Sequence, residues 1–559
     1  MKSKVFPKEN NLFYLGLIFI VWLITYVICQ FTFPHYLGWD EMSYLSVARG
    51  IAEDFDFSGR SYTVMGILKY GYPSNLINFP VFPIYLALFF KIFGASQKIA
   101  YFSTWIAALG VCYFIYFIFK SLVNSGPKVS SVVALSYLFF PTVLRNCDTA
   151  MMEQAGCFLL CLFVYVLLRD FEKGFNYLSV VKIGLLLLLL WLYKSLFTGL
   201  IFGVLIFLLL SYSPKITGKK INSKISALLL IVISYLLFAV LYWILKEYVF
   251  YPVAPMMNFH PLQESKQVYA DFLGGLFNDF PSNIVSNIHA FIKVILGSYF
   301  IYPSTLKLYE GEYATYQNSI LTMPSFYFLI GIYIFFFFVM IMMTFASWKK
   351  LSPIARVFIC FSLGSILFFN LALIIVFKVY HENFWRYNSN YLPLYICSFA
   401  VLLYSNLEYF KPFTMEHPRI SKILLAFTFG FVYIPLFVST INHYADYEKS
   451  FYNRAHGNAE LVKYFVKDSK PAFIYFNDGI HSTFTDYPIK QVFKDATNEQ
   501  LIQANSILPQ PIEFLFLNQR DWLFQINKEK IIKAAPIIND EYKMYGYTAD
   551  GSIVVYKRS

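Results

Sequence analysis

The sequence predicts a mainly α-helical protein that crosses the membrane many times and ends in a small α/β domain outside it. Of its 559 residues, 58% are hydrophobic and only 14% are charged, which is too apolar for a soluble chain of this length. About eleven apolar runs approach the roughly 20 residues that a helix needs to cross a bilayer. The last stretch, residues 444–559, returns to a globular composition and alternates helix-like with strand-like segments.

The spans follow one another along residues 1–443, which we interpret as one membrane domain. Residues 80–94 are also apolar, but we interpret them as a re-entrant or surface helix rather than a span. If this run is not counted as a span, every Lys- and Arg-rich loop falls on the same side of the membrane. This agrees with the rule that cytoplasmic loops are rich in Lys and Arg. The predicted spans are residues 12–31, 98–119, 129–144, 154–168, 178–193, 196–212, 225–246, 325–346, 355–377, 390–406 and 421–442.

This topology puts the N-terminus in the cytoplasm and the tail outside, with the chain in the cytoplasmic (inner) membrane. Lys and Arg number 45 against 33 Asp and Glu, yet the tail carries 14 of each, so the whole excess lies in the membrane domain. We attribute the excess to cytoplasmic loops and not to nucleic-acid binding. The segments predicted to lie outside are residues 32–97, about 145–153, the break around Lys194, residues 247–324, 378–389 and the tail.

The cysteines and the two ends of the chain fit the same interpretation. All seven cysteines lie in or beside apolar runs without metal-ligand spacing, so we expect neither a disulfide framework nor a zinc site. The first apolar run follows Lys2, Lys4 and Lys8 and is too long for a signal-peptide core, so we expect a retained anchor. In the tail, "AELVKYFVKD" predicts a helix, whereas "AFIYFND", "IEFLFLN" and "SIVVYKR" predict strands.

Two adjacent carboxylates, Asp40 and Glu41, stand just beyond the first span. From Glu41 onward the apolar residues are spaced as on one side of a helix, which predicts a helix lying along the membrane surface. Asp40 fits an N-cap of that helix, with Glu41 in the first turn, and it fits a catalytic carboxylate equally well. The residues alone leave both roles open. The apolar side of this helix comprises Tyr44, Leu45, Val47, Ala48 and Ile51.

Further polar residues interrupt or flank the spans on the same predicted outside face. A lysine at the edge of an apolar run is costly to place, so Lys194 is a candidate functional residue, although snorkelling to the interface also explains it. Arg145 and Arg386 have the same two explanations, and together the three cations would bind a phosphate or diphosphate group. His381 and Glu382 are too few to predict a metal site. The acidic residues of the second outside segment are Asp148 and Glu153.

The order of these motifs resembles the GT-C class of membrane glycosyltransferases, specifically the family that includes protein O-mannosyltransferases and lipid A aminoarabinose transferases (glycosyltransferase family 39-like). The family's Asp-Glu pair followed by a Tyr is here "WDEMSYLSVARGI". A proline-bearing segment follows, "NFPVFPIYLALFFKIFG", in which Phe79-Pro80-Val81 replaces the common His-Pro-Pro. The resemblance covers about residues 36–210 and 384–396. The matching positions are Asp40, Glu41, Tyr44, Glu153 or Asp148, Lys194, Arg386, Tyr387 and Pro393.

The resemblance implies transfer of a sugar from a polyprenyl-phosphate carrier to a lipid, glycan or protein acceptor outside the membrane, with inversion at the anomeric carbon. Asp40 would then be the general base and Glu41 a supporting carboxylate, while Lys194 and Arg386 would bind the donor phosphate. We expect membrane lipid and this lipid-linked donor as partners and no nucleic acid, and a divalent-metal requirement stays open. The further substrate-binding candidates are Arg145, Glu153, Tyr44 and Tyr387.

Two other classes of function compete with this one. A transporter or flippase of a lipid-linked saccharide would also place charges at the ends of spans, but such proteins often show repeated halves and broken helices, which this sequence lacks. A structural membrane subunit with a partner-binding tail would leave Asp40, Glu41 and Lys194 without a purpose. We therefore favour the glycosyltransferase over both.

Overall fold

The computed structural model describes part of the chain. The described positions are 11–32, 39–55, 61–64, 67–68, 81–147, 149–173, 176–193, 197, 200, 203–204, 236–238, 240, 342–375, 389–416, 462, 464–466, 471–476, 490–493, 497–518, 541–547 and 553–559.

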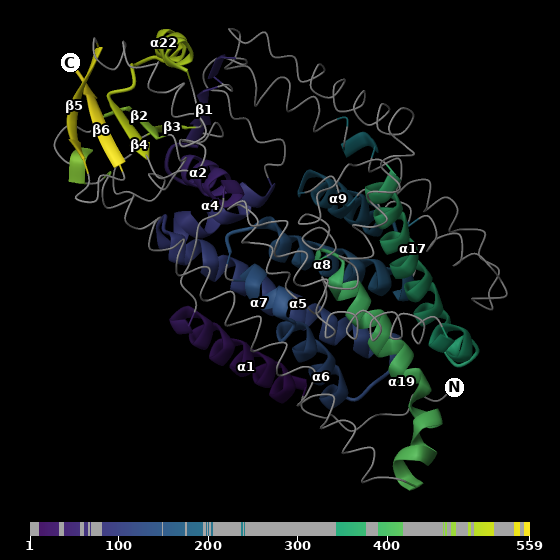
Figure 1. The fold of residues 1–559 in the computed structure, drawn as a ribbon. Coiled ribbons are helices and arrows are strands. Elements are labelled where there is room, and N and C mark those ends of the chain that lie inside the picture. Colours follow the sequence, from purple (N-terminus) through teal and green to yellow (C-terminus); the bar gives the residue numbers. More distant parts are fainter. Residues whose placement is uncertain are drawn as a thin grey trace, which may run out of the picture.

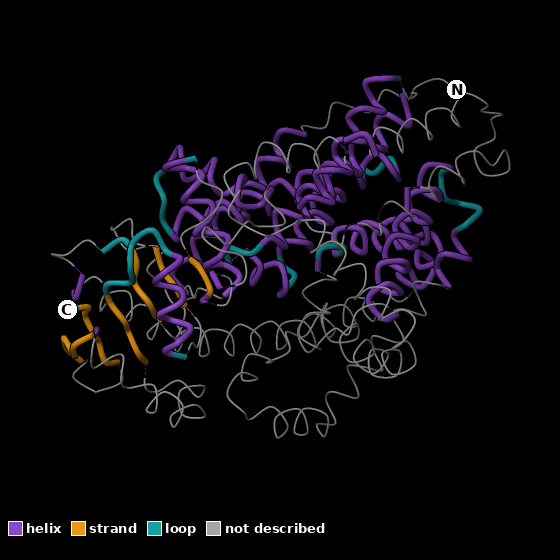
Figure 2. Tube along the Cα trace, turned by 90° about the horizontal axis from the view of Figure 1, so that it is seen from above, coloured by secondary structure: helices purple, strands orange, loops and turns teal. Residues whose placement is uncertain are grey.

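The molecule has a helical part and a sheet at one end of it (Figures 1 and 2). Two of the shorter helices, α2 and α4, lie between the sheet and the long helices, packed against each other. The long helices are α1 (Asn11–Thr32), α5 (Gln97–Val123), α8 (Met152–Lys173), α9 (Tyr177–Tyr193), α17 (Pro353–Ile375) and α19 (Leu392–Glu416). The shorter helices are α2 (Trp39–Asp54), α4 (Val81–Phe93), α6 (Pro127–Leu138), α7 (Pro141–Cys147) and α22 (Asn498–Ile507).

Three of the described helices are long and apolar enough to cross a membrane: residues Asn11–Phe31, Gln97–Val123 and Met152–Lys173. They coincide with predicted spans, as do the shorter apolar helices at Leu178–Tyr193, Pro353–Phe369 and Leu392–Asn406. The multi-pass helical fold class is therefore confirmed. The predicted spans 196–212, 225–246, 325–346 and 421–442 lie wholly or largely outside the described residues.

The structure divides one predicted span and shortens another apolar run. Residues 129–144 are not one helix, because α6 ends at Leu138 and α7 begins at Pro141. Proline has no N–H and disfavours helical geometry at the preceding residue, which accounts for the break. The run at residues 80–94 forms α4, whose 13 residues extend about 20 Å, less than the roughly 30 Å of the hydrocarbon layer. Helix α4 is therefore too short to cross the membrane by itself.

Helix α5 is at the centre of the helical part and packs against α8, α6, α19, α4 and α1. It starts cleanly, because the Ser96 side chain accepts a hydrogen bond from the amide of Ile99, and it ends at Asn124 in the left-handed region, with a φ of 52°. Its contact with α8 is close at Gly110, where a Cβ would lie 2.4 Å from Cε2 of Phe158. From α1, the indole Nε1 of Trp22 donates to the carbonyl of Trp105 at 2.8 Å.

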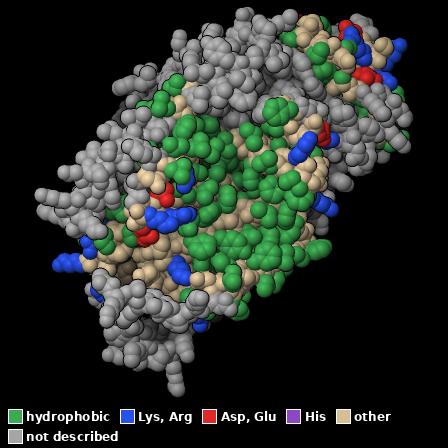
Figure 3. All heavy atoms as spheres, turned by 180° about the vertical axis from the view of Figure 1, so that it is seen from behind, with side chains coloured by type: hydrophobic (Ala, Val, Ile, Leu, Met, Phe, Trp, Pro, Cys, Tyr) green, Lys and Arg blue, Asp and Glu red, His purple; other side chains and the backbone are tan. Residues whose placement is uncertain are grey.

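Apolar side chains also cover much of one face of the helical part, with few charges among them (Figure 3). Helix α1 contributes exposed residues such as Phe13, Ile20, Ile24 and Ile28 over its whole length. Such a surface is unfavourable in water and costs nothing against lipid tails, so it agrees with a helix that faces the bilayer.

The sheet has six described strands in the order β1-β3-β2-β4-β6-β5. Neighbours among β1, β3, β2 and β4 are parallel, whereas β6 is antiparallel to both β4 and β5. The predicted strand runs of the tail coincide with β2, β4 and β6, and the predicted boundary at 444 lies outside the described residues. The strands are β1 (Ser61–Thr63), β2 (Phe473–Phe476), β3 (Lys490–Phe493), β4 (Phe514–Asn518), β5 (Tyr542–Tyr547) and β6 (Ile553–Arg558).

The sheet buries apolar side chains on both faces and is not made by the tail alone. One face packs against α22 and against Val64 and Ile67, and the other packs against Val462 and Val466. Strand β1, Val64 and Ile67 come from the segment between α2 and α4, so the first predicted outside segment supplies both an edge strand and part of the core. Since α2 carries Asp40 and Glu41, the sheet is tied to the helix with the candidate carboxylates.

Candidate active site

Helix α2 places the two adjacent carboxylates at the junction between the helical part and the sheet (Figure 1). The helix begins at Trp39, so Asp40 lies inside its first turn rather than before it as the predicted N-cap. The helix thus begins two residues earlier than predicted, and a carboxylate in the first turn still interacts favourably with the helix N-terminus. The side chain of Asp40 lies outside the described part. Of the predicted apolar side of α2, Leu45, Val47 and Ala48 are buried, and Tyr44 and Ile51 are half-buried.

Glu41 is a buried carboxylate that joins α2 to the start of α8. Its side chain is only 2% exposed, and its Oε1 accepts a hydrogen bond from the backbone amide of Ala150. A carboxylate that accepts from a backbone N–H makes one of the stronger protein hydrogen bonds, and burial strengthens it further. Glu41 therefore holds Ala150 against α2. Ala150 lies in the segment between the end of α7 at Cys147 and the start of α8 at Met152, the α7–α8 connection.

Helices α5 and α9 hold the same connection from other sides. Thr104 on α5 donates from Oγ1 to the carbonyl of Cys147 at 2.6 Å. The hydroxyl of Tyr193, the last residue of α9, donates to the carbonyl of Met152, the first residue of α8. Tyr44 on α2 also reaches Met152, with its hydroxyl 3.6 Å from the sulfur. The α7–α8 connection is thus fixed by side chains from three helices.

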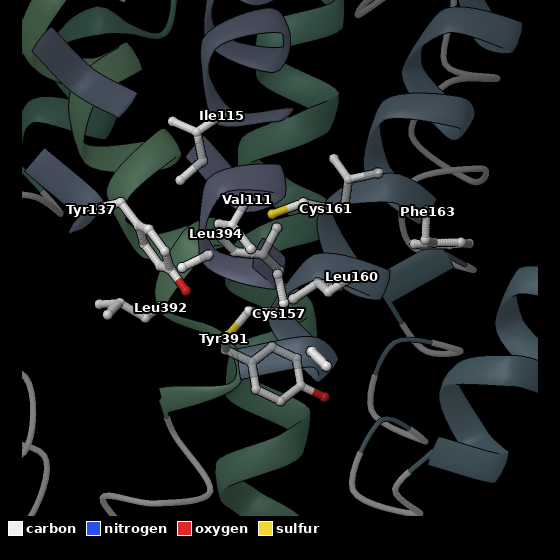
Figure 4. Packing of buried hydrophobic residues seen from close by; sticks show 14 of the residues in the cluster. Val111, Ile115, Tyr137, Cys157, Leu160, Cys161, Phe163, Tyr391, Leu392 and Leu394 are labelled. Carbon is white, nitrogen blue, oxygen red and sulfur yellow. The ribbon is translucent and has the colours of Figure 1, made fainter. Parts of the chain in front are cut away.

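Residues just before α19 complete the contacts around this connection. Asn146 donates from Nδ2 to the hydroxyl of Ser389 at 3.3 Å. The thiol of Cys157 lies 3.4 Å from the carbonyl of Ser389 and 3.6 Å from that of Asn390. Figure 4 shows Cys157 beside Tyr391 at this contact. The chain that leads out of the predicted Arg-Tyr motif therefore enters the same junction.

Glu153 is a second buried carboxylate at the junction, with 1% exposure in the first turn of α8. The helix N-terminus favours a negative charge at that position. Phe82, near the start of α4, contacts Tyr44 and Tyr193 with ring centroids 5.3 and 5.9 Å apart, both edge-on. The junction therefore combines two buried carboxylates with an aromatic cluster from α2, α4 and α9.

The structure brings together three of the predicted site residues with described side chains, namely Glu41, Tyr44 and Glu153, around the α7–α8 connection. Arg145 lies at the beginning of this junction on α7, and only its backbone is described. In the described ranges, no group of three or more His, Cys, Asp or Glu could hold a metal ion. Outside the described residues lie Asp148, Lys194, His381, Glu382, Arg386 and Tyr387.

Sequence reasoning missed Tyr193, Thr104 and Asn146. Each is polar in or beside an apolar run, but neither a tyrosine at the end of a span nor a threonine within one is unusual. Two of them could have been noticed from their neighbours in the sequence, because Tyr193 directly precedes Lys194 and Asn146 directly follows Arg145.

Comparison with known proteins identifies the fold. No family model and no curated protein matches the sequence. Among solved structures, the crystal structure of ArnT from Cupriavidus metallidurans bound to undecaprenyl phosphate is similar, with a TM-score of 0.51 and 10% identity over 98% of this chain and 97% of that chain. The apo structure of the same protein gives a TM-score of 0.50 and 11% identity over the same shares. The chain thus shares the polytopic fold of that protein over nearly its whole length.

Proposed function

We propose that this protein is an integral-membrane glycosyltransferase that moves a sugar from a polyprenyl-phosphate carrier to a lipid, glycan or protein acceptor, with inversion at the anomeric carbon. The observation that carries the proposal is the hydrogen bond from Ala150 to Glu41, which joins the Asp-Glu motif of α2 to the α7–α8 connection. Motifs far apart in the sequence, which resemble one family in their order, thereby meet at one place. The fold shared with an ArnT that binds undecaprenyl phosphate agrees with a polyprenyl-phosphate donor.

The roles follow from the chemistry of the side chains. In the transfer step the bond between the anomeric carbon and the phosphate oxygen breaks, and a bond to the acceptor oxygen forms. We assign Asp40 as the base that takes the acceptor's proton. Lys194 and Arg386 would stabilise the phosphate that leaves, and Arg145 and Tyr387 would assist in binding it.

We assign Glu41 to positioning rather than to proton transfer, because it is buried and its Oε1 already accepts from a backbone amide. Tyr44 and Glu153 border the same junction and are assigned to substrate binding. The lipid-linked sugar donor is itself a substrate rather than a cofactor. The membrane orientation belongs to the proposal, with a cytoplasmic N-terminus and the site at the outer face of the cytoplasmic membrane.

The decisive experiment distinguishes transfer from transport. The full-length protein in liposomes receives undecaprenyl phosphate carrying a radiolabelled sugar, together with envelope extract as a source of acceptors. A glycosyltransferase releases free undecaprenyl phosphate and labels the acceptor, and Asp40→Asn should abolish both. Movement of intact labelled carrier across the bilayer without its consumption, in the wild type and in Asp40→Asn alike, would instead establish the flippase.

A further inference from the structure

Tyr193 has no role in the reaction assigned above, yet its surroundings are unusually well defined. Its side chain is fully buried at the end of α9, and its hydroxyl donates to the carbonyl of Met152. A helix already uses that carbonyl for the amide four residues further on, so the phenol is a second donor to an oxygen with two lone pairs. The hydrogen bond therefore adds no helix capping and serves to join the end of α9 to the beginning of α8.

Each end of this hydrogen bond is one residue from a candidate substrate-binding side chain. The carbonyl of Met152 belongs to the peptide group that connects Met152 to Glu153, and Tyr193 directly precedes Lys194. Consecutive Cα atoms are about 3.8 Å apart, so fixing Tyr193 restricts where the Lys194 side chain begins. Glu153 is itself buried, in the first turn of α8.

The ring of Tyr193 is held as firmly as its hydroxyl. A Cβ on Gly156 would lie 3.0 Å from Cε1 of Tyr193, so the absence of a side chain there lets the ring pack directly on α8. Phe82 contacts the ring edge-on at 5.9 Å, and Phe197 lies against it at 6.5 Å. These three neighbours of the ring restrict where the hydroxyl can lie.

We infer that Tyr193 is a positioning residue that fixes Lys194 relative to Glu153, so that the lysine ammonium meets the donor phosphate at a defined place. The inference rests on the proposed function. A lysine has a flexible four-carbon stem and a compact charge, so the base of the stem must be fixed if binding energy is not to be lost in ordering it. Without the hydroxyl, α9 and α8 remain packed but lose the hydrogen bond that joins Tyr193 to the carbonyl of Met152.

The test is a double-mutant cycle on binding of undecaprenyl phosphate, the probe, to full-length protein in nanodiscs. Tyr193→Phe removes only the hydroxyl and should weaken binding about 10-fold in the wild-type background. In the Lys194→Ala background the same change should alter affinity less than about twofold, because no lysine remains to be positioned. The matched control is Tyr116→Phe, since Tyr116 is a fully buried tyrosine on α5 whose hydroxyl donates to Asn11 at 2.9 Å. Tyr116→Phe should lower the unfolding temperature about as much as Tyr193→Phe does, but it should bind undecaprenyl phosphate with wild-type affinity.

A second variant, Gly156→Ala, keeps the hydroxyl and displaces the ring, and it too should weaken binding while Lys194 is present. Wild-type affinity in Tyr193→Phe, or an equal loss with and without Lys194, would overturn the inference while the proposed function stands. Failure of the wild-type protein to bind undecaprenyl phosphate would remove the proposed function itself, and this inference with it.

Discussion

At the residue scale, Glu41 can be tested separately as a charge and as a hydrogen-bond acceptor. Its Oε1 accepts from Ala150 in a buried site. Glutamine keeps a carbonyl oxygen there, so Glu41→Gln should retain most of the sugar transfer. Glu41→Ala leaves the amide of Ala150 without this acceptor, which costs about 1–3 kcal/mol, and transfer should fall about 5-fold to 100-fold. Transfer by membranes matched for protein content measures both variants.

Glu53 supplies the control for Glu41 within the same helix. It forms an ion pair with Arg49 one turn away, at 2.7 Å on a partly exposed surface. Such a pair contributes only a few tenths of a kcal/mol. Glu53→Ala should therefore transfer sugar like the wild type, and equal losses in Glu53→Ala and Glu41→Ala would show that any carboxylate removed from α2 is harmful.

Asp40 separates helix stabilisation from catalysis. Both Asp and Asn are accepted at a helix start, and losing the charge in the first turn costs about 0.3–1 kcal/mol, so Asp40→Asn should insert and fold normally. An amide cannot take the acceptor's proton, and loss of a general base lowers rates about 100-fold to 10,000-fold. We expect Asp40→Asn to bind undecaprenyl phosphate with wild-type affinity and to transfer almost no sugar. Turnover near the wild-type value would leave Asp40 as a residue of the helix start only.

The charged members of the junction could be found in the sequence because charges are rare in an apolar chain. Asp40, Glu41 and Glu153 stand out for that reason. Their partners could not be found in this way, since Glu41 binds a backbone amide and every residue except proline has one. Tyr193 likewise depends on a carbonyl of another helix, and its residue type alone predicts only an aromatic residue at the membrane interface.

At the scale of elements, the contact between α5 and α8 depends on Gly110. A Cβ there would meet the ring of Phe158 at 2.4 Å, and Phe158 itself packs against Phe114 in a tilted arrangement with ring centroids 5.6 Å apart. Gly110→Ala should destabilise the protein by about 1–3 kcal/mol, as overpacking does, despite the better helix propensity of alanine. Gly16→Ala on α1 is the control, because nothing lies within 4 Å of its added Cβ. In detergent, the unfolding temperature of Gly110→Ala should be lower than that of the wild type. The unfolding temperature of Gly16→Ala should equal or exceed the wild-type value.

The elements that sequence analysis identified are those with a local pattern. Long apolar runs gave α1, α5 and α8, and buried strand runs gave β2, β4 and β6. Strand β1 has only three residues and pairs in parallel with β3 from the other end of the chain, so it has neither the length nor the alternation of a predictable strand. The break between α6 and α7 was predictable from Pro141, but the apolar composition on both sides concealed it.

At the scale of the whole molecule, the proposed orientation can be tested by single-cysteine labelling in a background without the seven native cysteines. Cys157→Ser keeps a donor toward Ser389 and should leave this background folded. With an impermeant reagent, a cysteine near Asn477 should react in intact cells, and one near Gly218 should react only after the membrane is breached. The reverse pattern would place the candidate site on the cytoplasmic face and exclude an extracytoplasmic acceptor.

The sheet takes a strand from the first predicted outside segment, so the stability of the tail can be tested with and without that strand. A fragment from about residue 455 to the C-terminus contains β2 to β6 and most of both buried faces, so it should unfold cooperatively on its own. It lacks β1, Val64 and Ile67, the last two fully buried in the full chain. Burying such side chains stabilises by about 1.5–3 kcal/mol each, reduced by the cost of closing a linker. Joining residues 61–68 to the fragment through a flexible linker should therefore raise its unfolding temperature, and Ile67→Ala in that fusion should reverse much of the gain. An unchanged unfolding temperature would mean that the tail does not depend on residues 61–68. A fragment that folds only in the fusion would instead move the domain boundary to include those residues.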